Sequence, residues 1–135
     1  MINGIRDLRL WQESVALGGE VARAIHACSR RETRQLTDRI LHTALDVAER
    51  VAEGYERPPA EQARCYRRAR ATLTVLETLL AIARQANLLP APVHTQLATR
   101  IGTASRLLTG YLTFVNRRAD VAEGAGAAGA AAAPG

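Results

Sequence analysis

Residues 66–83, YRRARATLTVLETLLAIA, decide the fold of this 135-residue chain. The apolar side chains of this stretch recur in steps of three and four, at Tyr66, Ala69, Leu73, Leu76, Leu80 and Ala83. This period places all of them on one face of an α-helix, because a helix completes a turn in about 3.6 residues. The stretch therefore predicts a long amphipathic helix.

The same spacing occurs in three other blocks, which begin at Leu8, Leu36 and Val93. No segment shows the alternation of apolar and polar residues that is typical of strands. Gly and Pro residues and short polar segments separate the blocks, so the sequence predicts helices over about 8–28, 32–56, 59–87 and 92–117. Because short connections make neighbouring helices antiparallel, we expect an all-α protein with one domain, residues 1–118, folded as an antiparallel up-down-up-down four-helix bundle.

The last segment, residues 119–135, consists almost entirely of Ala and Gly, and we expect it to be a disordered tail. Removing it takes away Asp120 and Glu123 and no basic residue, which raises the formal net charge from +5 to +7. No apolar run reaches the roughly 18 residues of a membrane span, and no signal peptide opens the chain. Cys28 and Cys65 form no disulfide pattern, so a soluble cytoplasmic protein without membrane partners is expected.

All 18 basic residues are arginines, whose guanidinium groups bind phosphate through two parallel hydrogen bonds. Four of them fall within seven residues of the third predicted helix, with no acidic residue among them. We predict a nucleic-acid-binding surface that contacts the phosphate backbone of RNA or DNA and does not read sequence, formed by Arg57, Arg64, Arg67, Arg68, Arg70, Arg106, Arg117 and Arg118. The alternative is a solvated face whose arginines pair with neighbours such as Glu56 and Glu61. Aromatic residues are too few for a base-stacking platform, so binding would depend on the backbone.

The other polar residues do not form a recognisable catalytic or metal-binding pattern. His26, His42 and His94 lie in different blocks without a second ligand at metal spacing, and no Glu-x-x-His motif is present. We therefore expect no cofactor, no metal and no enzymatic activity. Glu49 and Glu53 are expected to contact arginines across an interface rather than to act as paired catalytic carboxylates. Glu77 lies in the most apolar part of its helix, and we expect a structural ion pair with Arg39, or otherwise with Arg106.

The second and third helices have more apolar positions than one bundle core needs, at Leu41, Leu45, Ala48 and Ala52 and at Val75, Leu79, Ile82 and Ala86. This excess predicts self-association, and the alternative is a helix enclosed on all sides within the monomer. Gly102 and Gly110 each cost about 1 kcal/mol against Ala in a helix, so we expect a neighbouring helix to approach closely there.

Several motifs resemble those of known families. The opening Ile5-Arg6-Asp7-Leu8-Arg9-Leu10-Trp11-Gln12 resembles the F-x-D-L-x-V-W-Q start of the bacterial four-helix bundle family encoded in intervening sequences of ribosomal RNA genes. Val51-Ala52-Glu53-Gly54 continues the likeness, although Arg50 stands where that family usually has Asn.

The second half resembles a related family, the accessory variability determinant proteins of diversity-generating retroelements. Asp38-Arg39-Ile40 and the run from Arg67 to Leu89 are similar to that family's pattern, with Glu77 where Arg is common. The segment from Ile101 to Leu112 resembles its I-G-R-x-L-G-G-W ending, with Ser105 and Thr109 in place of glycines and Tyr111 in place of Trp. The likeness covers residues 5 to about 118.

This resemblance implies a homopentameric ring of four-helix bundles that binds nucleic acid and a reverse transcriptase and has no catalytic activity. From it we expect an accessory protein that assists mutagenic retrohoming by holding template RNA or cDNA. A protein–protein adaptor, whose arginines contact an acidic partner without nucleic acid, is the alternative.

Overall fold

The structure is a computed structural model that describes residues 4–132, with side chains described for residues 4–124. It contains four long helices, α1 (Arg9–Cys28), α2 (Arg34–Gly54), α3 (Pro59–Gln85) and α4 (Ala91–Ala132). Two short 3₁₀ helices, η1 (Gly4–Asp7) and η2 (Arg31–Thr33), precede α1 and α2. No strand occurs in the described part of the chain, so the prediction of an all-α protein is confirmed.

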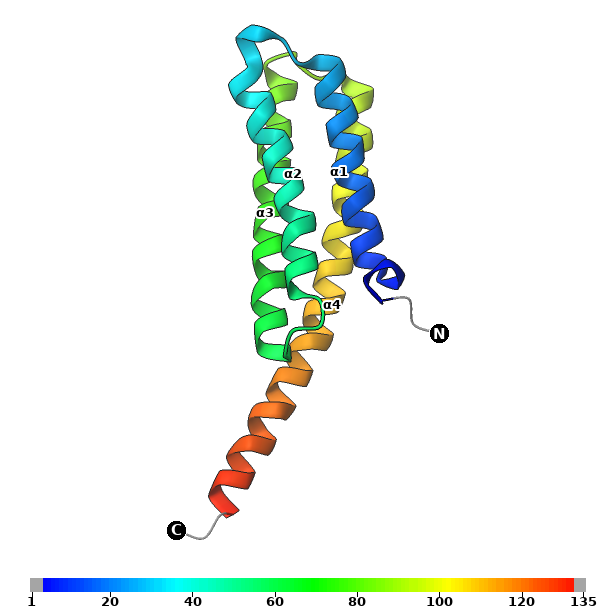
Figure 1. Cartoon of the computed structure of the whole chain (residues 1–135). Coiled ribbons are helices and arrows are strands. Elements are labelled where there is room, and N and C mark those ends of the chain that lie inside the picture. The colour runs from blue at the N-terminus through cyan, green and yellow to red at the C-terminus, as the bar shows by residue number, and fades with distance from the viewer. Residues whose placement is uncertain (1–3, 133–135) are drawn as a thin grey trace.

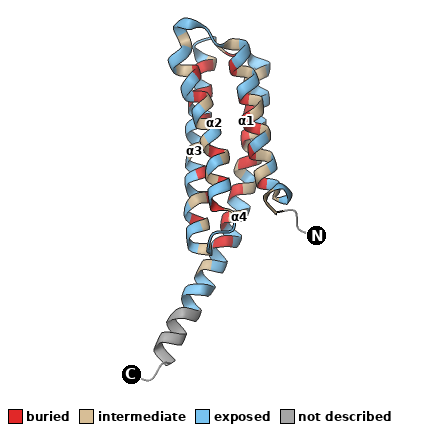
Figure 2. Ribbon diagram, in the orientation of Figure 1, coloured by how far each residue is buried: buried red, intermediate tan, exposed pale blue. Residues whose placement is uncertain are grey.

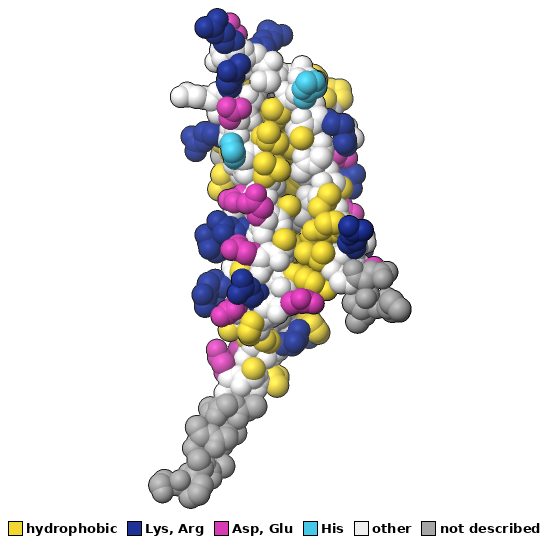
Figure 3. Space-filling model, in the orientation of Figure 1, with side chains coloured by type: hydrophobic (Ala, Val, Ile, Leu, Met, Phe, Trp, Pro, Cys, Tyr) yellow, Lys and Arg dark blue, Asp and Glu magenta, His cyan; other side chains and the backbone are white. Residues whose placement is uncertain are grey.

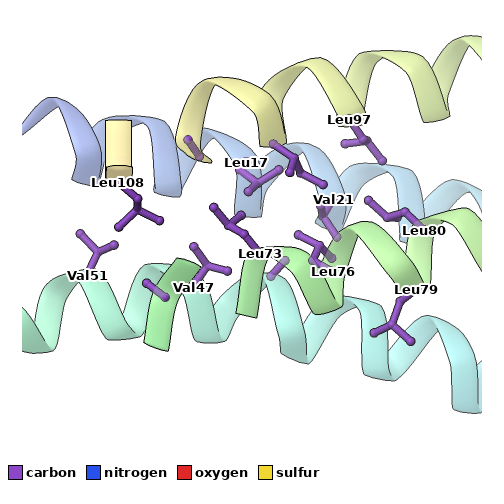
Figure 4. Close-up of a cluster of buried hydrophobic side chains, with 14 of the residues drawn as sticks. Leu17, Val21, Val47, Val51, Leu73, Leu76, Leu79, Leu80, Leu97 and Leu108 are labelled. Atoms are coloured by element: carbon purple, nitrogen blue, oxygen red, sulfur yellow. The ribbon is translucent and has the colours of Figure 1, made fainter. Parts of the chain in front are cut away.

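Each long helix packs against the one before it in the chain, and α4 also packs against α1 (Figure 1). The buried residues form stripes on the inward faces of the helices (Figure 2). Figure 4 shows side chains from all four helices, including Leu17, Val47, Leu76 and Leu108, directed into one shared hydrophobic core. The apolar periodicity of the sequence is thus the feature that brings the helices together.

The helix ends of α3 follow directly from local sequence. Pro59 occupies the first turn, where its missing N–H removes no helical hydrogen bond. At the other end Asn87 adopts a left-handed conformation with a φ of 60°. The Leu88 N–H then donates to the Ala83 carbonyl at 2.9 Å, and the Asn87 N–H donates to the Arg84 carbonyl at 3.1 Å. This pair of bonds is a Schellman motif, and it turns the chain towards α4.

Gly54, the last residue of α2, lies directly against α3. A Cβ atom at this position would be 2.9 Å from the Cys65 Cβ and 2.9 Å from the Tyr66 Cε1. Both distances are shorter than normal van der Waals contact, so only glycine fits this approach.

Gly102 and Gly110 do not mark the close helix approach that the sequence suggested. A Cβ at Gly102 would meet only the Arg106 Nη1, at 3.6 Å, and a Cβ at Gly110 would have no described neighbour within 4 Å. The reason is their orientation, because both lie off the face of α4 that packs into the core.

The Ala/Gly-rich segment also differs from its expected disorder. α4 continues without a break from the bundle through Ala132, while residues 133–135 lie outside the described part of the chain (Figure 1). Alanine has the highest intrinsic helix propensity, so a segment rich in it extends an existing helix even without tertiary contacts. None of the described helices is long and apolar enough to cross a membrane.

The additional apolar positions of α2 and α3 remain partly open to solvent. Leu45 is 43% exposed, and Val75 and Ile82 are each 49% exposed, although Leu79 is buried. The alternative of a helix enclosed on all sides is therefore wrong for this monomer. Hydrophobic side chains also gather along the groove between α1 and α2 (Figure 3).

Candidate nucleic-acid interface

The four clustered arginines of α3 all lie on its outer surface. Arg64, Arg67, Arg68 and Arg70 are exposed, and for the first three the spacing relative to the buried Tyr66 predicts this exposure. None of them forms an ion pair with a carboxylate of the described chain. Their positive charge is therefore available to a partner molecule.

Contacts between α3 and α4 place further arginines beside this cluster. The Arg67 Nη1 donates a hydrogen bond to the Asn116 Oδ1 of α4 at 3.4 Å. One residue earlier on α3, Tyr66 makes an edge-to-face contact with Tyr111, with ring centroids 6.3 Å apart. Burial raises the pKa of Tyr66 to about 12, so Tyr66 makes this contact as a neutral phenol. The first half of α3 thus lies beside the segment of α4 that contains the exposed Arg117 and Arg118.

Arg106 lies further along the same seam between α3 and α4. Its Nη2 donates to the Thr103 Oγ1 at 3.4 Å, and its side chain is exposed. It lines a shallow groove together with Glu77, Gly102 and Thr109. Seven of the eight predicted contact arginines have no carboxylate partner in the described chain, and we name these seven the basic face: Arg64, Arg67, Arg68, Arg70, Arg106, Arg117 and Arg118.

Arg57 differs from the other predicted contact residues because it has partners of its own. Its Nη1 lies 3.9 Å from the Glu61 Oε2, and its Nε donates to the Glu53 carbonyl at 3.1 Å. It therefore follows the alternative of a solvated, charge-balanced pair, and we leave it out of the basic face. Arg57 is held in this way because it follows the C-terminus of α2, where free carbonyl groups attract a cation.

The acidic residues of α2 likewise find arginine within their own helix. Arg50 lies 4.0 Å from Asp46 and 3.2 Å from Glu53. Within the described chain the arginine that pairs with Glu53 is three residues away on the same helix, and the expected contact of Glu53 across an interface stays a prediction.

The predicted ion pair between Glu77 and Arg39 does not form. Glu77 is exposed and lines the groove between α3 and α4, whereas Arg39 lines a different groove, between α2 and α3. The two side chains therefore lie on opposite flanks of α3. Glu77 shares its groove with Arg106, but the described residues include no ion pair between them.

The principal ion pair between helices joins residues that the sequence analysis missed. Arg100 of α4 donates from Nη1 to the Glu13 Oε2 at 3.0 Å and from Nη2 to the Glu20 Oε1 at 2.8 Å. The hydrogen bond from Arg100 lowers the pKa of Glu20, and the bond from Glu20, followed by that from Glu13, raises the pKa of Arg100. Glu13 and Glu20 are seven residues apart and so share one face of α1, which is the one signal the sequence offered.

No cluster of three or more His, Cys, Asp or Glu side chains within the described residues is arranged to hold a metal ion. Cys28 and Cys65 are free and partly buried. The strongest functional feature of this surface is therefore its uncompensated positive charge.

A comparison with protein-family models matches residues 6–110 to the 23S rRNA-intervening sequence protein family. The chain belongs to this family. The match spans all of α1, α2 and α3 and the part of α4 that packs in the bundle up to Gly110. Of the basic face, it includes the α3 arginines and Arg106, while Arg117 and Arg118 follow it. A search of curated protein sequences found no match to this chain.

Proposed function

We propose that this member of the 23S rRNA-intervening sequence protein family is a non-catalytic scaffold that binds nucleic acid in the cytoplasm through the basic face. The observation that carries the proposal is the concentration of these seven exposed arginines on the adjoining helices α3 and α4, where no carboxylate of the described chain forms an ion pair with them. Such a surface gains free energy by releasing counterions from phosphates. The family's name refers to an intervening sequence of 23S rRNA, which is consistent with a nucleic-acid ligand but names none.

The retroelement motifs extend this proposal to a specific setting. The runs from Arg67 to Leu89 and from Ile101 to Leu112 resemble the accessory variability determinant proteins. On that basis the scaffold assists a reverse transcriptase in mutagenic retrohoming and holds template RNA or cDNA. A reverse-transcriptase gene beside the gene for this chain, and co-purification of the two proteins, are the expected findings.

The proposed scaffold is an up-down-up-down bundle that assembles into a homopentameric ring. Support comes from the α2–α3 side, where Leu45, Val75 and Ile82 remain partly exposed. Beside them lies a groove of about 810 Å³, which Leu36, Leu79 and Ile82 help to line. Covering such apolar surface with a second copy removes it from water, and the ring repeats the basic face around its axis.

The decisive experiment is a titration of fluorescent structured RNA with the protein at several salt concentrations. We expect binding that weakens steeply with salt, and loss of that binding in the variant Arg64→Glu, Arg67→Glu, Arg68→Glu. The matched control is Arg30→Glu, Arg31→Glu, Arg34→Glu, which changes the net charge equally in exposed residues around η2. The control is expected to retain most of the affinity, because η2 lies at the end of the bundle away from the start of α3 (Figure 1).

An equal loss in both triple variants would attribute binding to net charge alone and would overturn the assignment to this face. No binding of the unaltered protein to RNA or DNA at low salt would refute the proposal. Competition by acidic peptides but not by RNA would then identify the arginines as the surface of a protein adaptor.

A further inference from the structure

α4 carries a second apolar stripe beside its core stripe, and this second stripe runs from the partly buried Leu107 and Tyr111 outward to Phe114 and Val121. Its core stripe ends with the buried Leu108, Leu112 and Val115. The second stripe consists of Leu107, Tyr111, Phe114 and Val121, in which Phe114 is 58% exposed and Val121 71% exposed. A phenyl ring left in water is costly, and apart from the Arg118 guanidinium over its face this ring remains largely open to solvent.

The surface beside the Phe114 ring is hollowed. A depression of about 260 Å³ is lined by Arg106, Leu107, Gly110, Tyr111 and Phe114. Gly110 has no side chain, and a Cβ atom built there would have no described neighbour within 4 Å. The missing side chain therefore leaves this part of the surface open. The depression is open, and its lining is mostly apolar.

Cations surround this depression. The Arg118 guanidinium carbon lies 5.7 Å from the centroid of the Phe114 ring. At about 100° per residue, Arg106, Arg117 and Arg118 all fall within about 80° of Phe114 around the helix axis. No acidic residue occurs in the sequence between Glu77 and Asp120, and Asp120 falls about 120° away from Phe114.

We propose that this depression receives one unpaired nucleobase, stacked on the Phe114 ring, while Arg106, Arg117 and Arg118 contact the flanking phosphates. The inference deepens the proposed function and rests on it, since Arg67 and Asn116 join the depression's helix to the rest of the basic face. Base stacking on an aromatic ring within a cationic groove is the usual mode of binding to single strands. The Arg118 guanidinium lies over the ring in the free protein, so it has to move outward to admit the base on that face, and it can then stack on the second face of the base.

The arginine rim favours a nucleobase over a protein occupant. A second copy docked symmetrically on this stripe would bring its own three arginines against these three, and like charges repel across an interface. An apolar peptide would leave the same three charges without partners. A base attached to phosphates can stack on the ring, while its phosphates pair with the arginines.

The test compares a single-stranded RNA that contains 2-aminopurine with a duplex of the same sequence, using the full chain. Phe114→Leu keeps an apolar side chain but removes the aromatic face, and Phe114→Trp keeps the face. We expect Phe114→Leu to weaken single-strand binding by about 5- to 100-fold, without changing its salt dependence or the affinity for duplex. Quenching of 2-aminopurine is expected with the unaltered protein and with Phe114→Trp, and is expected to be lost with Phe114→Leu.

Unchanged single-strand affinity and quenching in Phe114→Leu would overturn the stacking inference alone, provided that Arg64→Glu, Arg67→Glu, Arg68→Glu still abolishes binding. Failure of the unaltered protein to bind any RNA would overturn the proposed function and this inference together. A change in oligomeric mass in Phe114→Leu would identify the stripe as a protein interface and would equally overturn the inference. Circular dichroism confirms in each case that the variant is folded, which the exposure of Phe114 leads us to expect.

Discussion

The Arg100 Nη2 on α4 donates a hydrogen bond to the Glu20 Oε1 on α1 at 2.8 Å, and the same guanidinium group also binds Glu13. Glu20 retains only 13% of its side-chain exposure, and its second oxygen, Oε2, is buried without a hydrogen-bond partner among the described residues. Two carboxylates on one helix thus depend on a single cation from another. The arrangement joins the first helix of the bundle to the last.

Removing the Arg100 charge is expected to destabilise the fold. Arg100→Met keeps much of the aliphatic length but leaves two neighbouring carboxylates uncompensated, one of them largely buried. Because the Arg100 side chain is itself 34% exposed and partly screened by water, we expect a loss of about 1–2 kcal/mol in the free energy of unfolding. Urea unfolding of the variant and of the unaltered protein measures this difference in the free energy of unfolding. Arg84→Met, at a partly buried arginine without an ion pair in the described chain, is the control and should change stability less.

The same contact makes stability depend on pH. The pKa of Glu20 is lowered in the folded protein from its ordinary value of 4.5, so the unfolded chain binds this proton more readily. The stabilisation is therefore complete above pH 4.5, and it is lost as the pH falls through the lowered pKa that Glu20 has in the folded protein. We expect Glu20→Gln to be less stable than the unaltered protein near neutral pH, with a difference that narrows in acid. A difference independent of pH would contradict this assignment.

The periodic spacing of buried residues made the helices predictable from the sequence. The pairing of side chains between helices could not be predicted in this way. The stripe of α4 from Leu97 to Val115 was readable from its spacing alone, because a residue's own neighbours in sequence decide it. The partner of Arg100 depends on which helices become neighbours, and residues 80 apart in sequence give no local sign of that. Glu77 was placed in an ion pair because its sequence neighbours are apolar, but it lies at the edge of the buried stripe and stays exposed.

The basic face likewise has features that the sequence predicted and features that it did not. The exposure of Arg64, Arg67 and Arg68 followed from helical geometry relative to Tyr66, and the structure agrees. The pairing of Arg57 and the Phe114 depression did not follow, because both depend on where a helix ends or what lies beside it in space. The length of α4 was underestimated because the Ala/Gly-rich segment lacks anchoring apolar residues, although alanine itself favours helix.

Gly54→Ala is expected to loosen the contact between α2 and α3. The added methyl group would lie 2.9 Å from both the Cys65 Cβ and the Tyr66 Cε1, and Tyr66 is 1% exposed with little room to move. Overpacking of this kind costs about 1–3 kcal/mol. Thermal unfolding should show the loss for Gly54→Ala. The matched control Gly102→Ala meets only the end of the Arg106 side chain, at 3.6 Å, and should gain up to about 1 kcal/mol from helix propensity.

Charge placed on the apolar side of α3 is expected to break the proposed ring. Val75→Glu, Ile82→Glu introduces two carboxylates at positions that are each 49% exposed in the monomer, so the bundle itself can accommodate them. In an assembly that covers these side chains, the carboxylates would be buried without partners, at a cost of several kcal/mol. Analytical ultracentrifugation should therefore report a shift from oligomer to monomer with unchanged helicity. Val15→Glu, at a residue of α1 that is 45% exposed, should leave the mass of the assembly unchanged. An unaltered mass for the double variant would place the interface elsewhere on the bundle.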